Sequence, residues 1–142
     1  MPLPAKVSTQ PRTKPLVLCI DDDRPGLHAR KAILKAAGYN VLTASSGMLG
    51  LRLLSRYCVH LVILDYCMPE MDGGAVAREI RRRHPHLPII MLSGQIEVPD
   101  SVSRSVDVFV AKEQSPAVLL GSLNVLVGGG PGKRLPSRAS HV

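Results

Sequence analysis

Acidic, hydroxyl and basic side chains follow the ends of apolar segments that have the character of buried strands. They are Asp21, Asp22 and Asp23 after residues 16–20, Asp65 after 61–64, Ser93 after 88–92, and Lys112 after 106–110. Carboxylates gathered at one sheet edge repel one another unless a cation neutralises them. A small set of oxygen ligands favours Mg²⁺ over Zn²⁺. A lysine and a hydroxyl beside that cation would complete a cradle for a phosphoryl group.

Each of these residues also has a purely structural interpretation. Asp23 can cap a helix that begins near Pro25. A single aspartate after a strand, such as Asp65, is commonly a turn residue. The functional interpretation therefore rests on the combination of side chains and on the elements that bring them together.

The elements that must position these side chains alternate between strand and helix patterns. Strands are expected at 16–20, 40–44, 61–64, 88–92 and 106–110. Helices are expected at 25–37, 46–56, 73–83, 116–127 and, cut short by Pro99, 97–104. Pro25 suits a first helical position and Gly38 a helix C-terminus. The alternation predicts a three-layer, doubly wound α/β fold with a five-stranded parallel sheet, whose ligands bind beyond the carboxyl ends of the strands.

The composition excludes several classes of protein. The 142 residues are 45% hydrophobic and 20% charged, which is typical of one globular domain. No apolar run approaches the ~18 residues of a membrane span, and the first residues have no apolar core of a secretory signal. The three cysteines cannot all pair and show no CxxC spacing, which argues against disulfide scaffolds and zinc modules. A reducing, cytoplasmic location is therefore expected.

The formal net charge of +7 belongs to the ends of the chain. Residues 1–14 and 128–142 each carry three basic and no acidic residues, whereas the segment between them has 12 basic and 11 acidic residues. Both ends are rich in Pro, Gly or Ser and are expected to be flexible basic tails. Six scattered charges give only weak, salt-sensitive binding to nucleic acid. With no Trp and one Phe, a stacking platform for nucleic acid is not expected.

Four segments carry the residues described above, in this order: VLCIDDD, LVILDYCMPEMDG, PIIMLSG and VFVAK. Together they resemble the receiver domain of two-component response regulators, and the resemblance covers residues 15–127. It implies a flavodoxin-like sheet with strand order 2-1-3-4-5. It also implies that Asp65 is the phospho-accepting aspartate and that Asp21 and Asp22 hold Mg²⁺, with Asp22 a direct ligand and Asp21 acting through water.

The resemblance assigns roles to the remaining site residues as well. The backbone carbonyl of Cys67 joins Asp65 as a further Mg²⁺ ligand, Lys112 binds the phosphoryl group, and Ser93 and Phe109 form the switch. The implied function is acceptance of a phosphoryl group from a sensor histidine kinase or a histidine phosphotransfer protein, without enzymatic turnover. Nothing in the tails resembles an output domain, so the expected type is a stand-alone receiver.

One departure from the family keeps two alternatives open. The family commonly has a proline, joined by a cis peptide, after the lysine, whereas this chain has Glu113. A cis bond before a non-proline residue costs about 3 kcal/mol, which leaves the conformation of Lys112–Glu113 open. One alternative is a non-phosphorylated pseudo-receiver that acts only through protein contacts. The other is an aspartyl-phosphate phosphatase, but DDDRPG lacks the DxDxT-like motif of such enzymes.

Two surface features lie outside these motifs. Residues 116–127 carry no charge, and Val118, Gly121, Ser122 and Val125 form a small-residue face, which predicts a homodimer or kinase contact unless the valines are simply solvent-facing. The basic run 81–83 at a helix C-terminus is explained by the helix dipole, and His84 and His86 are expected in a loop.

Overall fold

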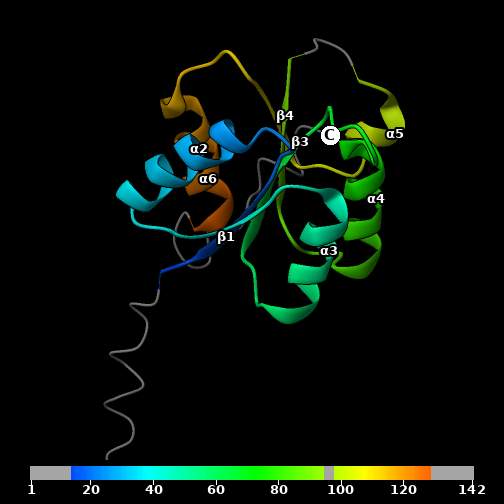
Figure 1. Cartoon of the computed structure of the whole chain (residues 1–142), viewed down its shortest axis with the longest axis horizontal. Helices are drawn as coiled ribbons and strands as arrows, with labels where there is room; N and C mark the ends of the chain where they lie inside the picture. The colour runs from blue at the N-terminus through cyan, green and yellow to red at the C-terminus, as the bar shows by residue number, and fades with distance from the viewer. Residues whose placement is uncertain (1–13, 95–97, 129–142) are drawn as a thin grey trace, which may run out of the picture.

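The computed structural model describes residues 14–94 and 98–128 (Figure 1). Five strands form a parallel sheet with the order β2-β1-β3-β4-β5, which confirms the predicted topology. Their bounds are β1 (Leu16–Ile20), β2 (Asn40–Ala44), β3 (Leu61–Asp65), β4 (Ile89–Ser93) and β5 (Val108–Ala111).

Helices cover both faces of the sheet, so the predicted three layers are confirmed. Their bounds are α2 (Arg24–Ala36), α3 (Gly47–Arg56), α4 (Gly73–Arg83), α5 (Asp100–Ser103) and α6 (Pro116–Val127). In Figure 1, α2 and α6 lie on one side of the sheet and α3, α4 and α5 lie on the other. Helix α5 is a single turn with Pro99 at its N-cap, in line with the short helix expected there. The expected start of that helix, residue 97, lies outside the described residues.

The alternation of side chains along the strands divides the core into two halves. Leu18 and Ile20 of β1 pack with the residues of α3 and α4, whereas Val17 and Cys19 pack with the residues of α2 and α6. All residues of β3 are buried, as the uninterrupted apolar run at 61–64 predicts for a strand covered on both faces, and those of β4 are buried too.

Local capping fixes where the helices begin and end. Ser46 and Asp72 cap α3 and α4 by accepting hydrogen bonds from the backbone N–H groups of Leu49 and Ala75. Helix α2 ends in a Schellman motif at Gly38, whose φ of 101° is a conformation that glycine adopts at little cost. The N–H of Gly38 donates to the carbonyl of Lys35 at 3.0 Å, and the next residue donates to the carbonyl of Leu34. The predicted helix C-terminus at Gly38 is thus confirmed.

The predicted basic tails, apart from residues 14 and 128, lie outside the described residues. Among the helices of the described part of the chain, none has both the length and the apolar character needed to cross a membrane.

Candidate functional site

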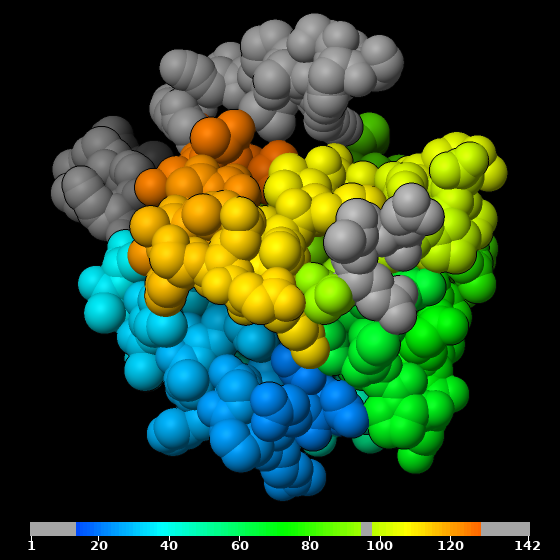
Figure 2. Space-filling view, turned by 90° about the horizontal axis from the view of Figure 1, so that it is seen from above, coloured from blue at the N-terminus to red at the C-terminus, as the bar shows by residue number. Residues whose placement is uncertain are grey.

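The parallel register brings the predicted site residues to one edge of the sheet. Ile20 pairs with Leu64, and Ser93 pairs with Ala111, so Asp21, Asp65, Ser93 and Lys112 all lie at or just beyond neighbouring strand ends. The backbone N–H of Lys112 donates to the carbonyl of Ser93 at 3.0 Å, which extends the ladder past β5. Figure 2 looks onto this edge, where the segments that follow β1, β3 and β5 meet.

The three carboxylates expected to hold a cation form a cluster. Asp21, Asp22 and Asp65 each place an oxygen within 4.8 Å of the others. Asp21 and Asp65 are buried, whereas Asp22 is exposed. The oxygens of Asp21 are already engaged: Oδ1 accepts from the backbone N–H of Asp23 at 3.0 Å, and Oδ2 faces Nη1 of Arg30 at 3.4 Å.

Arg30 was not predicted as a site residue. It lies on α2, nine residues after Asp21, and its side chain turns back toward the sheet edge. The interpretation of Asp23 as a capping side chain is wrong in one respect. Asp23 is the N-cap residue of α2, but its side chain makes no capping hydrogen bond, and its backbone N–H donates to Oδ1 of Asp21.

Asp65 and Lys112 form the central ion pair. Nζ of Lys112 lies 2.7 Å from Oδ1 of Asp65, whose side chain is only 2% exposed. Burial raises the pKa of Asp65 above its ordinary value; the Lys112 ammonium acts in the opposite direction, and the Asp21 charge adds to the increase. Burial by itself would lower the pKa of Lys112, but the adjacent Asp65 carboxylate outweighs it, so that the pKa of Lys112 is raised.

The position of Lys112 does not require a cis peptide bond. Among the described residues every peptide bond is trans, including the one between Lys112 and Glu113. The Lys112 ammonium nevertheless reaches Asp65. The replacement of proline by Glu113 therefore leaves the lysine in place.

The loop after Asp65 is held tightly against α4 by Gly73. The N–H of Gly73 donates to the carbonyl of Tyr66 at 2.8 Å. A β-carbon at position 73 would lie 2.3 Å from the carbonyl oxygen of Asp65 and 2.7 Å from Cα of Tyr66. Only glycine permits this approach, so Gly73 is a positioning residue for Asp65.

The other predicted residues surround this centre. Ser93 is buried at the end of β4. Phe109 is 39% exposed on β5, opposite Met91 in the register. Cys67 is exposed in the loop after Asp65. The roles of Ser93 and Phe109 as a switch, and of the Cys67 carbonyl as a ligand, stay predictions.

The donor set fits a hard divalent cation. The clustered side-chain ligands are all carboxylate oxygens. Oδ1 of Asp65 is buried without a hydrogen bond of acceptable geometry, although the Lys112 ammonium lies close to it. A buried anionic oxygen that lacks a hydrogen-bond partner is stabilised by a cation. The carboxylates of Asp21, Asp22 and Asp65 are therefore suited to Mg²⁺.

Comparison with known proteins decides the family. The model of the response regulator receiver domain matches residues 17–124. The chain belongs to this family. The receiver domain of a Clostridium thermocellum response regulator has a TM-score of 0.75 and 30% identity, covering 80% of this chain and 94% of that one. Response regulator protein TrrA from Thermotoga maritima, in complex with Mg(2+)-BeF, has a TM-score of 0.75 and 29% identity, covering 79% of this chain and 98% of that one.

The curated relatives are longer proteins. The transcriptional regulatory protein GlrR of Escherichia coli (strain K12) is 44% identical over 91 residues, which are 63% of this chain and 20% of that protein. The probable transcriptional regulator ycf27 of Guillardia theta is 37% identical over 110 residues, which are 75% of this chain and 43% of that protein. This receiver thus spans less than half of these relatives, and the similarity concerns the receiver alone.

Proposed function

We propose that this receiver accepts a phosphoryl group on Asp65 from the phosphohistidine of a sensor histidine kinase or a histidine phosphotransfer protein. The observation that carries the proposal is the 2.7 Å pair between Lys112 and Asp65 beside the clustered carboxylates of Asp21 and Asp22. This combination supplies a nucleophile, a cation and further oxygen ligands at one place.

The chemistry is a direct phosphoryl transfer. A carboxylate oxygen of Asp65 forms a bond to phosphorus as the P–N bond of the donor breaks, and the electron pair of that bond stays on the imidazole nitrogen. The product is an acyl phosphate on Asp65. The Lys112 ammonium, 2.7 Å from Oδ1, offsets negative charge on the phosphoryl oxygens as they enter the pocket.

Asp22, Asp65 and the Cys67 backbone carbonyl would hold Mg²⁺, and Asp21 would act through water. When bound, the ion neutralises charge on the phosphoryl oxygens. The bonds that Asp21 makes to Asp23 and Arg30 support its indirect role, because both of its oxygens already face donors. Exposed Asp22 keeps its carboxylate available.

Ser93 and Phe109 would report the modification. The new phosphoryl oxygens are strong acceptors, toward which the Ser93 hydroxyl would turn. Phe109, now 39% exposed, would then move inward and change the surface formed by β4, α5 and β5.

Phosphorylation with acetyl phosphate and Mg²⁺, followed by intact-mass spectrometry, tests the proposal. The natural chain should gain one base-labile phosphate and Asp65→Asn none, whereas Asp100→Asn, at an exposed aspartate on α5, serves as the matched control and should be labelled normally. A labelled Asp65→Asn variant would contradict the assignment. Absence of labelling in the natural chain would indicate a pseudo-receiver, and repeated turnover of phosphate esters would indicate a phosphatase.

The metal assignment has its own test. Titration with Mg²⁺ should show a larger loss of affinity for Asp22→Ala than for Asp21→Ala, because only Asp22 is assigned as a direct ligand. Equal losses would contradict the ranking.

Two further parts of the proposal concern the setting of the protein. We place it in the reducing cytoplasm, where Cys19, Cys58 and Cys67 stay free thiols as they are in the structure. We also retain a homodimer through α6, whose Val118 and Val125 are exposed. Light scattering of the natural chain and of the double variant Val118→Glu/Val125→Glu would test this dimer. Equal masses of the two proteins would exclude a dimer through α6.

A further inference from the structure

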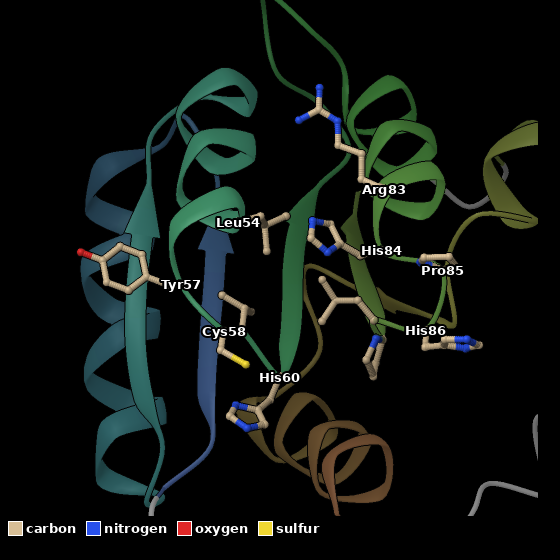
Figure 3. A pocket seen from close by; sticks show the side chains of 11 residues that line it. Leu54, Tyr57, Cys58, His60, Arg83, His84, Pro85 and His86 are labelled. Carbon is tan, nitrogen blue, oxygen red and sulfur yellow. The ribbon is translucent and has the colours of Figure 1, made fainter.

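A pocket lies at the opposite end of the sheet from Asp65. Its volume is about 560 Å³, within the range of ligand-binding clefts. It is formed where α3 and α4 end and where β3 and β4 begin (Figure 3). The proposed phosphoryl chemistry does not use this pocket.

The lining combines apolar side chains with a rim of hydrogen-bond donors. Leu54, Val59, Leu87 and Pro88 contribute apolar surface. The rim includes Tyr57, His60, Arg83 and His84, and none of the eleven lining residues is acidic. Tyr57 is 49% exposed, so its ring is accessible to a partner, and tyrosine is enriched at protein interfaces.

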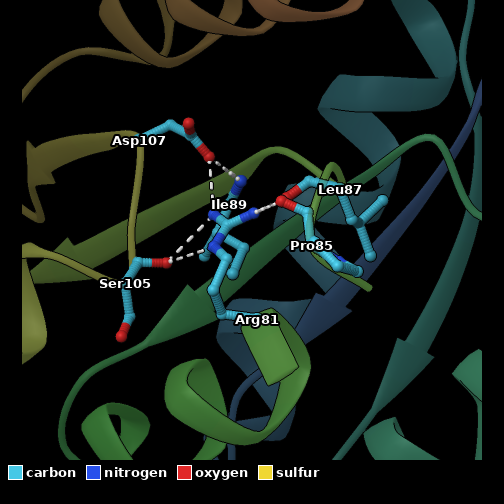
Figure 4. A network of polar contacts seen from close by, with 6 residues as sticks. All are labelled: Arg81, Pro85, Leu87, Ile89, Ser105 and Asp107. Carbon is cyan, nitrogen blue, oxygen red and sulfur yellow. Dashed lines mark hydrogen bonds and ion pairs between the residues drawn. The ribbon is translucent and has the colours of Figure 1, made fainter. Parts of the chain in front are cut away.

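One wall of the pocket is held in place by Arg81 (Figure 4). Its Nη1 donates to the carbonyls of Pro85 and Leu87, both at 2.9 Å. Its Nη2 donates to Oδ2 of Asp107 at 2.9 Å, and the same oxygen accepts from the backbone N–H of Ile89 at 2.8 Å. Because these bonds draw the loop carbonyls toward Arg81, the conformation of the loop that carries His84 is fixed before any ligand arrives.

This network adds to the interpretation of the basic run 81–83 by the helix dipole. The guanidinium of Arg81 also donates to the carbonyl of Ser105, so it joins α4 to the segment before β5. Arg82 and Arg83 share one carboxylate, that of Glu79, at 2.6 Å each. Among the described residues, Glu79 therefore offers one negative charge to these two arginines, of which Arg83 lines the pocket.

The opposite wall is held by His60. Its Nδ1 accepts a hydrogen bond from the backbone N–H of Leu16 at 3.0 Å, and its own backbone N–H donates to the Leu16 carbonyl at 2.8 Å. An imidazole that accepts at Nδ1 carries its proton on Nε2. His60 therefore adds a further N–H donor rather than a metal-binding lone pair.

We propose that this pocket docks an acidic peptide segment of a partner protein that also carries an apolar side chain. Carboxylates of the segment would meet the donors His60 and His84 and the guanidinium of Arg83, whose charge Glu79 offsets only in part because it also pairs with Arg82. The apolar side chain of the segment would pack on the apolar lining residues of the pocket, next to Tyr57. Fixed walls reduce the conformational entropy lost on binding. The docking proposal goes beyond phosphoryl acceptance, and the test of docking does not depend on whether Asp65 is phosphorylated.

Nuclear magnetic resonance titration of the full, isotope-labelled chain tests the docking site. The probes are a short synthetic peptide of alternating Glu and Leu residues and its counterpart with Lys in place of Glu. We expect the acidic peptide to shift the resonances of Tyr57, His60 and His84, and the basic peptide to leave them unchanged. His84→Glu should weaken binding about tenfold, whereas the same substitution at exposed His28 on α2 should change it less than about twofold.

A second variant guards against misfolding of the first. Tyr57→Ala alters an exposed side chain. It should also weaken binding of the acidic peptide, while the spectrum remains that of a folded protein. The proposal is overturned if the acidic peptide shifts no pocket resonance at millimolar concentration, or if its shifts map to α2 or Lys112 instead. Equal binding to the natural chain and to a folded His84→Glu variant would also overturn it.

Discussion

Gly73 packs directly against the backbone of Asp65 and Tyr66, and replacing it by alanine should disturb both stability and the proposed chemistry. The new β-carbon would lie 2.3 Å from the Asp65 carbonyl oxygen and 2.7 Å from Cα of Tyr66. Ordinary contacts of a β-carbon begin near 3.4 Å. The backbone of either segment must therefore retreat by about 1 Å, because neither neighbour is a flexible side chain.

The size of the effect follows from two opposing contributions. Overpacking at a closely packed site costs roughly 1–3 kcal/mol, and a backbone contact belongs at the upper end of that range. Alanine at the start of α4 recovers at most about 1 kcal/mol of helix propensity. We expect Gly73→Ala to lower the free energy of unfolding by about 2 kcal/mol.

Urea denaturation gives the measurement. With a slope of roughly 2 kcal/mol per molar urea, the midpoint should fall by about 1 M. Gly121→Ala is the matched control, because a β-carbon there meets no atom within 4 Å and alanine in helix α6 should stabilise by up to about 1 kcal/mol. Gly73→Ala should also slow labelling of Asp65 by acetyl phosphate. The reasoning is refuted if both alanine variants shift the midpoint in the same direction.

Three other outcomes follow from the structure. In metal-free buffer, Asp65→Asn should stabilise the fold at pH 7, because the pKa of Asp65 is raised in the folded state and its charged carboxylate therefore costs free energy. This stabilisation by Asn should vanish as the pH falls through the folded pKa of Asp65 toward the unfolded value. Urea denaturation of both proteins at pH 7 and pH 4 gives the comparison. Arg81→Met should destabilise by about 2–4 kcal/mol, because the carbonyls of Pro85, Leu87 and Ser105 lose their bonds to Arg81 and Asp107 loses its ion pair with Arg81. The same urea method measures the change, and an unchanged midpoint would contradict this. Burial raises the pKa of Cys19 to about 12, so this thiol should not react with iodoacetamide in the folded protein. Mass spectrometry should show two added groups on the native chain, at the exposed thiols Cys58 and Cys67, and three after unfolding.

The strands were predictable because their signals are local, whereas the strand order followed from the resemblance of the four motifs to receiver domains. The uninterrupted apolar run at 61–64 marked β3 as a strand covered on both faces, and the polar residues after the strands, such as Asp65, Ser93 and Lys112, marked the edge of the site. The boundaries differed by one or two residues where tertiary contacts intervene. Asp65 belongs to β3 because it still pairs with Leu92 of β4. The fifth strand begins at Val108 rather than residue 106, because the carboxylate of Asp107 is held by Arg81 and by the start of β4.

The contacts that refine the site join residues that are distant in the sequence or differently spaced from any motif. Arg30 reaches Asp21 from α2, nine residues further along the chain. Gly73 touches the backbone of Asp65 from the start of the next helix. Such contacts depend on how α2 and α4 pack against the sheet. Residue types and spacing alone do not contain that geometry.

The two ends of β5 show how the site and the rest of the fold are mechanically related. Before the strand, Asp107 is bound to Arg81 and to the start of β4. After the strand, Lys112 is bound to Asp65. Phosphorylation would act on the Lys112 end, while the Arg81 network holds the other end against α4. Sliding of the whole strand would break that network, so a response to phosphorylation should be confined to side chains near the site, with Phe109 the exposed group placed to move.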